Sequence, residues 1–144
     1  MANTSLGSKW SSFAPQLLAV LRIVAAFMFI LAGTSKLFAF PVPLPPGVTA
    51  HVLSLVWFAG VLEVFGGALV LVGLCTRPIA FVLAGEMAVA YFKAHFPHSF
   101  WPTVNGGVSA VLYCFIWLYL SAAGAGAWSL DALRRKSSTP ATAR

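Results

Sequence analysis

Two glutamates inside long apolar runs are the residues of this sequence best suited to chemistry. Glu63 and Glu86 are two of its three acidic residues, and both lie in the stretch 57–93. A carboxyl group in the middle of an apolar helix is costly unless it is paired, protonated or turned toward a polar cavity, so each marks a candidate functional site. Arg77 and Pro78 lie almost midway between them. An antiparallel helical hairpin that turns there places both carboxyls at a similar depth.

Two basic residues in the first apolar run are the candidate partners of these acids. Arg22 and Lys36 fall within about 40° of each other around a helix. Depths counted along the expected helices bring Arg22 next to Glu86 and leave Glu63 roughly 10 Å from both bases. We therefore expect an Arg22–Glu86 ion pair within a buried polar network of all four residues. Snorkelling to the membrane surface is the competing interpretation; it is equally open for Arg22 and is preferred for Lys36.

Glu63 has no obvious cation in this arrangement and is therefore the candidate proton-exchanging residue. A buried carboxyl of this kind suits proton exchange with a quinone or with a transported substrate. The alternative is a structural network that only holds the helices together. The sequence identifies no catalytic residue beyond this candidate.

The composition places these residues in a membrane protein. The chain is 60% hydrophobic and 8% charged, with a mean hydropathy of +0.89, whereas about 25% of a soluble domain is charged. Its 144 residues suit one domain and leave no room for a separate soluble enzyme. The basic residues cluster at the ends of apolar runs rather than in an aromatic-rich patch, so nucleic-acid binding is not expected.

The expected fold is an all-α, integral membrane four-helix bundle. Its transmembrane helices are predicted at about 16–40, 50–74, 78–96 and 105–123, within a domain that covers 15–128. Residues 1–14 form a cytoplasmic lead-in. Residues 129–144 form a short cytoplasmic surface helix, Leu130 to Lys136, and a disordered tail from Ser137. Lysine and arginine gather on one side of the four spans, which predicts both termini in the cytoplasm.

Glycines give the second span faces that another helix can approach closely. Gly60 and Gly67 are seven residues apart, as are Gly66 and Gly73, so each pair shares one side of the helix. Glu63 lies between these two rows. The pattern predicts a closely packed seam in which one carboxyl is embedded.

The sequence contains no recognisable metal site or soluble active-site motif. His95 and His98 are three residues apart, but no cysteine or acid accompanies them, so we expect interfacial histidines and no metal. Cys75 and Cys114 differ in expected depth by roughly 15 Å, which is too far for a disulfide. Glycine-rich nucleotide motifs and nucleophile elbows are absent. No cofactor is expected from a recognisable motif. A quinone stays a candidate because of the proton-exchanging role considered for Glu63, and its electrons would come from a partner.

Four segments occur together in an order that points to one family. They are LRIVAAFMFILAGTSKLF, FAGVLEVFGGALVLVGLCTRPIA, PTVNGGVSAVLY and GAGAWSLDALRR. They contain an E-x-x-G-G motif at 63–67, a G-x-x-T-R motif at 73–77 and a final S-L-D at 129–131. In this order they resemble the DoxX family of small four-helix bacterial inner-membrane proteins. The resemblance covers nearly the whole chain.

The resemblance implies a connection to quinone chemistry. The family is named after a subunit of an archaeal thiosulfate:quinone oxidoreductase, and some members look like membrane anchors of redox or oxidative-stress complexes. Many members carry an acid directly after N-G-G, where this chain has Val108, so a polar site on the fourth helix is in doubt. The family's motif positions would be Arg22, Lys36, Glu63, Arg77, Asn105, Gly106 and Gly107.

These observations predict a multi-pass protein of the bacterial inner membrane that is a subunit or anchor of a quinone-linked oxidoreductase. The alternative is a non-catalytic membrane protein, either a small transporter or an assembly factor that holds partner helices through its glycine seam. Whether the chain is an enzyme stays open, because it has no self-sufficient catalytic motif. The expected partners are the lipid bilayer, with redox proteins, a quinone or a second copy of the chain as candidates.

Overall fold

The computed structural model describes residues 6–137, which are helical with connecting loops and contain no strand. The long helices are α2 (Ala14–Phe38), α3 (Leu55–Val72), α4 (Thr76–Ala90) and α6 (Val108–Ala123). The shorter ones are α1 (Leu6–Ser12), the π-helical turn η1 (Tyr91–His95), α5 (Pro102–Asn105) and α7 (Leu130–Ser137). Most of the predicted disordered tail lies outside the described residues, and its first residue, Ser137, belongs to α7.

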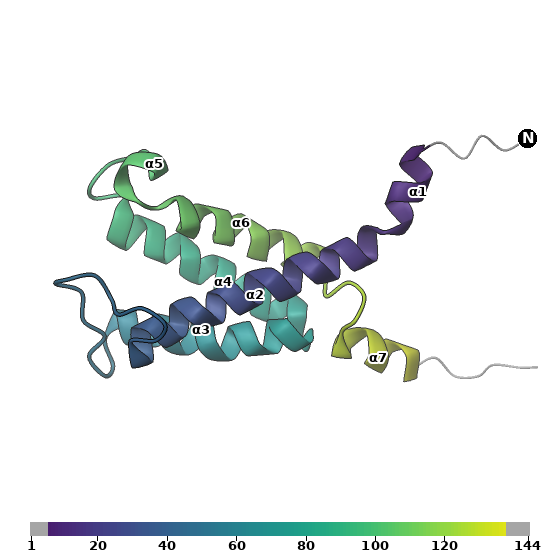
Figure 1. Cartoon of the computed structure of the whole chain (residues 1–144), viewed down its shortest axis with the longest axis horizontal. Coiled ribbons are helices and arrows are strands. Elements are labelled where there is room, and N and C mark those ends of the chain that lie inside the picture. Colours follow the sequence, from purple (N-terminus) through teal and green to yellow (C-terminus); the bar gives the residue numbers. More distant parts are fainter. Residues whose placement is uncertain (1–5, 138–144) are drawn as a thin grey trace, which may run out of the picture.

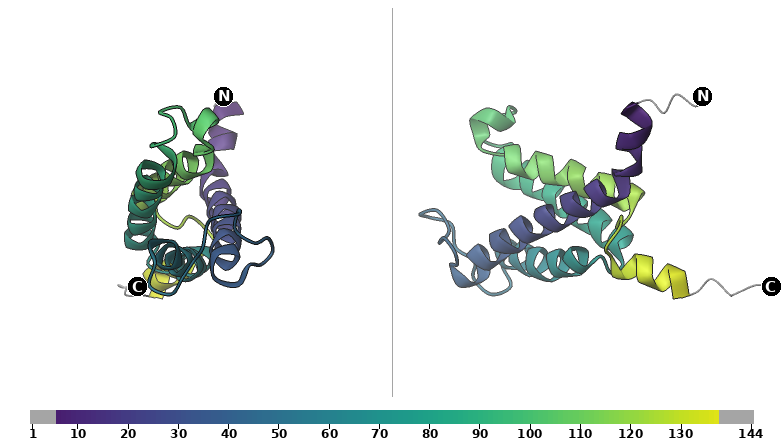
Figure 2. Two further views of the ribbon diagram at one scale, coloured as in Figure 1. Left: turned by 90° about the vertical axis from the view of Figure 1, so that its left-hand side faces the viewer. Right: turned by 45° about the vertical axis from the view of Figure 1, so that its right-hand side comes forward.

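The long helices form two packed pairs, α2 with α3 and α4 with α6, and a short turn joins α3 to α4. The view along the helices in Figure 2 shows the pairs arranged around a common centre. Phe29 of α2 fills part of this centre, with its ring centroid 5.1 Å from those of Tyr113 and Trp117 on α6. Helices α1 and α7 lie at one end of the long helices, and α5 lies at the other (Figure 1).

Helix α3 begins later than the sequence suggests. Ser54 is its N-cap, with the side-chain oxygen accepting the Trp57 N–H at 3.2 Å. The expected start at residue 50 is wrong because residues 50–54 form an irregular turn, in which Leu53 has a φ of 68°. This shift of five residues moves the start of the helix by about 8 Å relative to its partner helices.

The predicted third and fourth spans correspond to broken helices. The segment predicted as the third span consists of α4 and the π-helical turn η1, and it ends close to the expected residue 96. The segment predicted as the fourth span is interrupted at its start, because Gly106 has a φ of +73° and separates α5 from α6. Helix α1 was not predicted. The surface helix α7 does begin as expected, since the Ser129 hydroxyl accepts the Ala132 N–H at 3.1 Å.

Large apolar side chains cover the outside of all four long helices. Phe27, Phe65, Phe81 and Phe115, one from each helix, are all more than half exposed. By length and composition, α2 and α3 can each cross a membrane, and α6 is a shorter apolar helix. An outer surface of this kind is suited to lipid rather than to water.

Candidate functional site

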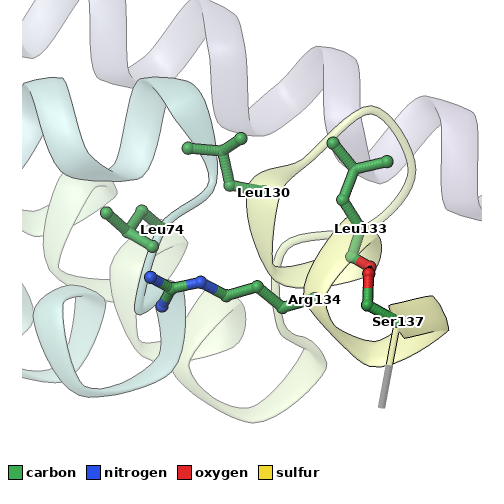
Figure 3. Close-up of a pocket in the computed structure, with 5 residues that line it drawn as sticks. All are labelled: Leu74, Leu130, Leu133, Arg134 and Ser137. Carbon is green, nitrogen blue, oxygen red and sulfur yellow. The ribbon is translucent and has the colours of Figure 1, made fainter. Parts of the chain in front are cut away.

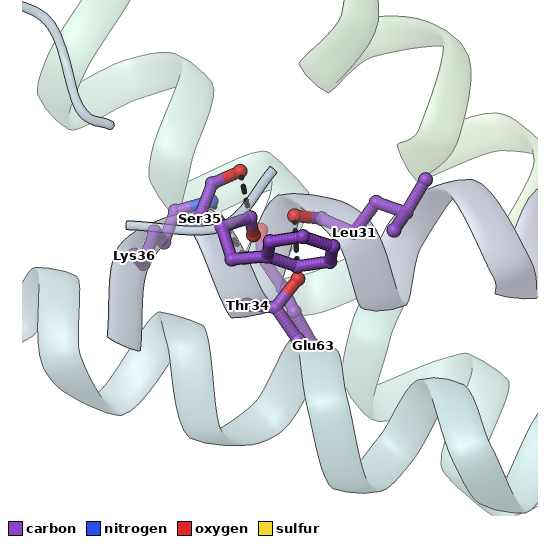
Figure 4. A network of polar contacts seen from close by, with 6 residues as sticks. Leu31, Thr34, Ser35, Lys36 and Glu63 are labelled. Carbon is purple, nitrogen blue, oxygen red and sulfur yellow. Dashed lines mark hydrogen bonds and ion pairs between the residues drawn. The ribbon is translucent and has the colours of Figure 1, made fainter. Parts of the chain in front are cut away.

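A lysine–glutamate ion pair connects α2 and α3. The Lys36 Nζ lies 2.6 Å from Glu63 Oε2 (Figure 4). The Glu63 side chain is only 3% exposed, and that of Lys36 is 23% exposed. Lys36 is in the last turn of α2, and Glu63 is near the middle of α3. A buried pair of this kind is held by strong charge-assisted hydrogen bonding.

Two glycines allow the helices to approach at this pair. A Cβ atom at Gly33 would lie 2.9 Å from the Glu63 Cβ, and one at Gly60 would lie 2.9 Å from the Leu37 Cγ. Both contacts are closer than side chains normally tolerate, so any larger residue would push α2 and α3 apart. The seam predicted around Glu63 is therefore present, with Gly33 as an additional member.

The expected distance between Glu63 and Lys36 is wrong, and so is the preference for a snorkelling Lys36. The late start of α3 brings Glu63 about 8 Å closer to the loop that follows α2. The long, flexible lysine stem covers the remaining distance and turns inward to the carboxylate. The two residues therefore form a direct ion pair.

Glu86 completes a group of three ionisable side chains that we call the polar trio, namely Lys36, Glu63 and Glu86. Both Glu86 carboxyl oxygens are buried and have no hydrogen-bond partner within residues 6–137. Glu86 is close enough to Glu63 and Lys36 to interact with them electrostatically. The trio has one positive group for two carboxyls, so it is electrically neutral only when one of these holds a proton.

Arg22 does not belong to this group, and the expected Arg22–Glu86 ion pair is wrong. Arg22 is fully buried, and among residues 6–137 its guanidinium donates only to backbone carbonyl oxygens. The acceptors are Val70 at 2.7 Å, Ala125 at 2.9 Å, Trp128 at 2.9 Å, and Leu71. The last carbonyls of a helix lack intrahelical donors and carry the negative end of its dipole, so the end of α3 is a good acceptor for a guanidinium.

Arg22 helps to hold the segment 124–131, which we call the C-terminal clasp. Its Asp131 carboxylate accepts the N–H groups of Cys75 and Thr76, each at 2.9 Å, and caps the start of α4. The Asp131 N–H donates to Gly73 O at 2.9 Å. Burial disfavours the charged carboxylate, but these N–H donors and the nearby Arg134 outweigh it and hold the pKa of Asp131 below its ordinary value.

Gly73 and Arg77, the first and last residues of the G-x-x-T-R motif, both pack against the clasp. Gly73 ends α3 with a φ of +70°, and a Cβ there would overlap the Ser129 side chain and lie 3.0 Å from Arg22 Nη1. Only glycine meets both conditions at low cost. The Arg77 guanidinium packs on the backbone of Gly124, where a Cβ would lie 3.3 Å from its Nε.

The Asn105-Gly106-Gly107 motif is located at the opposite end of the helices. The Asn105 side chain donates to Ser99 O at 2.7 Å and accepts the Gly107 N–H at 2.7 Å. A Cβ at Gly107 would lie 2.8 Å from the ring of Tyr91. These contacts fix the loop between η1 and α5, and none of them involves a residue of the polar trio.

The remaining glycines of the seam are occupied within the chain. A Cβ at Gly66 would lie 2.8 Å from Leu83 of α4, and one at Gly67 would lie 2.8 Å from Ile30 of α2. The seam therefore packs α3 against its own neighbours. It is not an open surface for the helix of a partner protein.

A groove of about 510 Å³ opens beside Lys36. Its wall consists of residues 35–39 at the end of α2 and, from the following loop, residues 43–44 and 48–51. Lys36 of the ion pair thus reaches a surface groove, and Glu86 interacts electrostatically with both members of the pair. Over the part of the chain that the structure describes, no three histidine, cysteine or acidic side chains are grouped closely enough to hold a metal ion.

Comparison with known proteins identifies the family. Residues 17–96, more than half of the chain, match the DoxX family model. The chain belongs to the DoxX family. A relative from Haemophilus influenzae, described as an uncharacterized protein, is 45% identical over 122 residues, which cover 83% of this chain and 91% of the relative. No solved structure matches the chain. This DoxX chain is accordingly a helical membrane protein that contacts the lipid bilayer.

Sequence reasoning missed two contributions to the charged sites of this DoxX protein. The capping role of Asp131 could have been suspected, because it is the third acid and lies in the S-L-D motif. Tyr113 of α6 is close enough to Glu63 to interact electrostatically, and its sequence context gives no signal for this. Within residues 6–137, Trp117 Nε1 is also buried without a hydrogen-bond partner.

Proposed function

We propose that this DoxX protein is a four-span subunit or anchor of a quinone-linked oxidoreductase in the bacterial inner membrane. The polar trio would be its proton-exchanging site, and the groove beside Lys36 would receive the quinone head group. The supporting observation is that both Glu86 carboxyl oxygens are buried without a hydrogen-bond partner within residues 6–137, although Glu86 interacts electrostatically with an ion pair whose lysine lines a groove. A pair that only held α2 and α3 together would not need a second buried carboxyl.

The arrangement of the helices supports four spans. Helix α4 and the turn η1 together provide 20 continuous helical residues, or about 30 Å, which matches the hydrocarbon core of a bilayer. Helix α6 packs along α4. Arg77, in the first turn of α4, packs on Gly124 shortly before α7. It therefore lies at the same end of the long helices as the basic residues of α7, and α1 lies at that end too (Figure 1). This asymmetry supports placing both termini in the cytoplasm.

The residues of the trio suit the protonation that accompanies quinone reduction. A quinone takes up two electrons and two protons when it becomes a quinol. The Lys36 ammonium, at the groove wall, can donate a hydrogen bond to a carbonyl oxygen there, and Glu63 and Glu86 can hold and release a proton behind it. The sequence has no flavin, haem or metal motif, so the electrons would be delivered by a partner protein.

The glycine seam gives no support to the alternative scaffold function. Its positions Gly60, Gly66 and Gly67 already contact side chains of α2 and α4. A helix from another protein would have to displace these contacts, at the cost of the packing that holds the molecule together.

Purification from bacterial membranes in a mild detergent tests the proposal. The wild type should retain more quinone than an unrelated helical membrane protein does, and a redox protein should co-purify with it. Lys36→Gln should lower the retained quinone about tenfold, which corresponds to the loss of one charge-assisted hydrogen bond. Leu112→Gln, on the exposed face of α6, is the control and should retain it. Background levels of quinone together with no redox partner would refute the proposed function.

A further inference from the structure

A second groove lies at the other end of the molecule, between α7 and the end of α3. It has a volume of about 500 Å³ (Figure 3). Its lining residues are Leu74, Leu130, Leu133, Arg134 and Ser137. Leu74 belongs to the turn that follows α3, and the other four belong to α7. The groove thus lies where the surface helix α7 meets the turn at the end of α3.

This groove combines an apolar lining with a cation. Leu130 is 41% exposed and Leu133 is 59% exposed, so both present apolar surface that the chain itself does not cover. The Arg134 side chain extends from α7 toward Leu74 (Figure 3). Within residues 6–137, no hydrogen bond uses its guanidinium, although Arg134 interacts electrostatically with Asp131. Five N–H donors are therefore available at the edge of an apolar surface.

The charge around the groove favours an anion. Arg134, Arg135 and Lys136 are consecutive on α7, and Asp131 is the only acid of that helix. Both Asp131 oxygens already accept backbone N–H groups at the start of α4. The carboxylate is thus committed to the cap and only partly offsets the positive charge of the helix.

The geometry points to one anionic phospholipid as the occupant of this groove. Its phosphate would contact Arg134, and one acyl chain would lie along Leu74, Leu130 and Leu133. Trp128, 66% exposed just before α7, is the residue type that gathers at head-group level. Basic pockets beside the ends of membrane helices bind lipid head groups in this way. A free phosphate ion would gain nothing from the three leucines, so the lining favours a lipid.

This inference is independent of the quinone proposal. It uses the contact of this DoxX protein with the bilayer and the groove at α7, and neither depends on the polar trio. An anionic lipid bound here would bridge α7 and the α3–α4 turn, the same two parts that the clasp holds together.

Photolabelling of the full-length protein in vesicles tests the assignment. The chain is reconstituted in phosphatidylcholine that contains a trace of a phospholipid with a photoreactive acyl chain, carrying either a phosphatidylglycerol or a phosphatidylcholine head group. The labelled residues are then mapped by mass spectrometry at high salt, which suppresses diffuse attraction by distant charges. We expect phosphatidylglycerol to label Leu74 and the segment 130–137 about tenfold more strongly, as one charge-assisted contact predicts.

Two variants of α7 with the same net charge complete the test. Arg134→Gln should reduce the preference for phosphatidylglycerol to about twofold or less, whereas Lys136→Gln, which does not line the groove, should keep most of it. Equal losses in the two variants would contradict a specific site. Equal labelling by the two lipids in the wild type would also contradict it. Suppression of the label by inorganic phosphate would show that the site binds a free anion instead of a lipid.

Discussion

Two groups of charged side chains lie at different levels of the same helices. At the C-terminal clasp, the Arg22 guanidinium of α2 reaches four carbonyl oxygens, and both Asp131 oxygens accept N–H groups. In the polar trio, Glu63 is paired with Lys36, but both Glu86 oxygens are buried without a hydrogen-bond partner within residues 6–137. The clasp therefore satisfies its charged groups, whereas the trio leaves one carboxyl unsatisfied.

This difference separates architecture from a candidate function. A buried charged group that makes all of its hydrogen bonds stabilises one arrangement of the chain, and removing it leaves several buried partners unpaired. A buried carboxyl without a partner contributes little to that arrangement and is free to exchange a proton. We therefore expect substitutions in the clasp to lower stability, and substitutions at Glu86 to affect quinone retention.

The largest loss of stability is expected for Arg22→Gln. The glutamine side chain cannot reach the end of α3 and the clasp together, so several buried carbonyls lose their donor, at a cost of about 3–5 kcal/mol. Unfolding in detergent with a denaturing surfactant gives the free energy of unfolding. Leu21→Gln, at a partly exposed neighbouring position, provides the control. Equal destabilisation by the two variants would contradict the assigned role of Arg22.

A somewhat smaller loss is expected for Gly73→Ala. The alanine must adopt a backbone φ of +70°, and its methyl group would also overlap Ser129. Together these two effects should lower the free energy of unfolding by about 2–3 kcal/mol. Gly47→Ala is the matched control, because Gly47 has a φ of +87° but open space around it. The control should show only the conformational part, about 1 kcal/mol. If the two substitutions lower the free energy of unfolding by the same amount, the close contact between residue 73 and the clasp does not contribute to stability.

A modest loss that depends on pH is expected at Asp131. Because its pKa is lowered in the folded state, its contribution is present above the ordinary aspartate pKa of about 3.9 and is lost as the pH falls below that value. Asp131→Asn should cost roughly 1 kcal/mol at neutral pH, as expected for a weakened helix cap. Unfolding curves at pH 7 and pH 3 should differ less for the variant than for the wild type. The same pH dependence in both proteins would assign the titration to another group.

Parts of this architecture could be predicted from the sequence because they depend on local signals. The apolar runs predicted an all-helical membrane protein, Pro78 and its neighbours predicted the α3–α4 turn, and Ser129 predicted the start of α7. The motif order predicted the DoxX family. The four-span topology and the quinone site remain proposals.

The partners of the charged residues could not be predicted, because they depend on tertiary contacts. A five-residue error in the predicted start of α3 is enough to make the expected distance between Lys36 and Glu63 too long for an ion pair. The sequence suggests an acid or the membrane surface for Arg22, because backbone acceptors are not visible in a sequence, yet its partners are carbonyl oxygens distant along the chain. Asp131 bonds back across more than 50 residues to the start of α4.

The smallest effect on stability and a large effect on binding are expected together for Glu86→Gln. This substitution keeps the size of the side chain and removes only its ability to exchange a proton, so the free energy of unfolding should change by no more than about 0.5 kcal/mol. The most direct test measures the quinone retained per folded molecule in Glu86→Gln and in the wild type, after the same detergent purification. The account predicts a loss of about tenfold with unchanged stability. Quinone retained at the wild-type level, or lost only in proportion to a loss of folded protein, would contradict it.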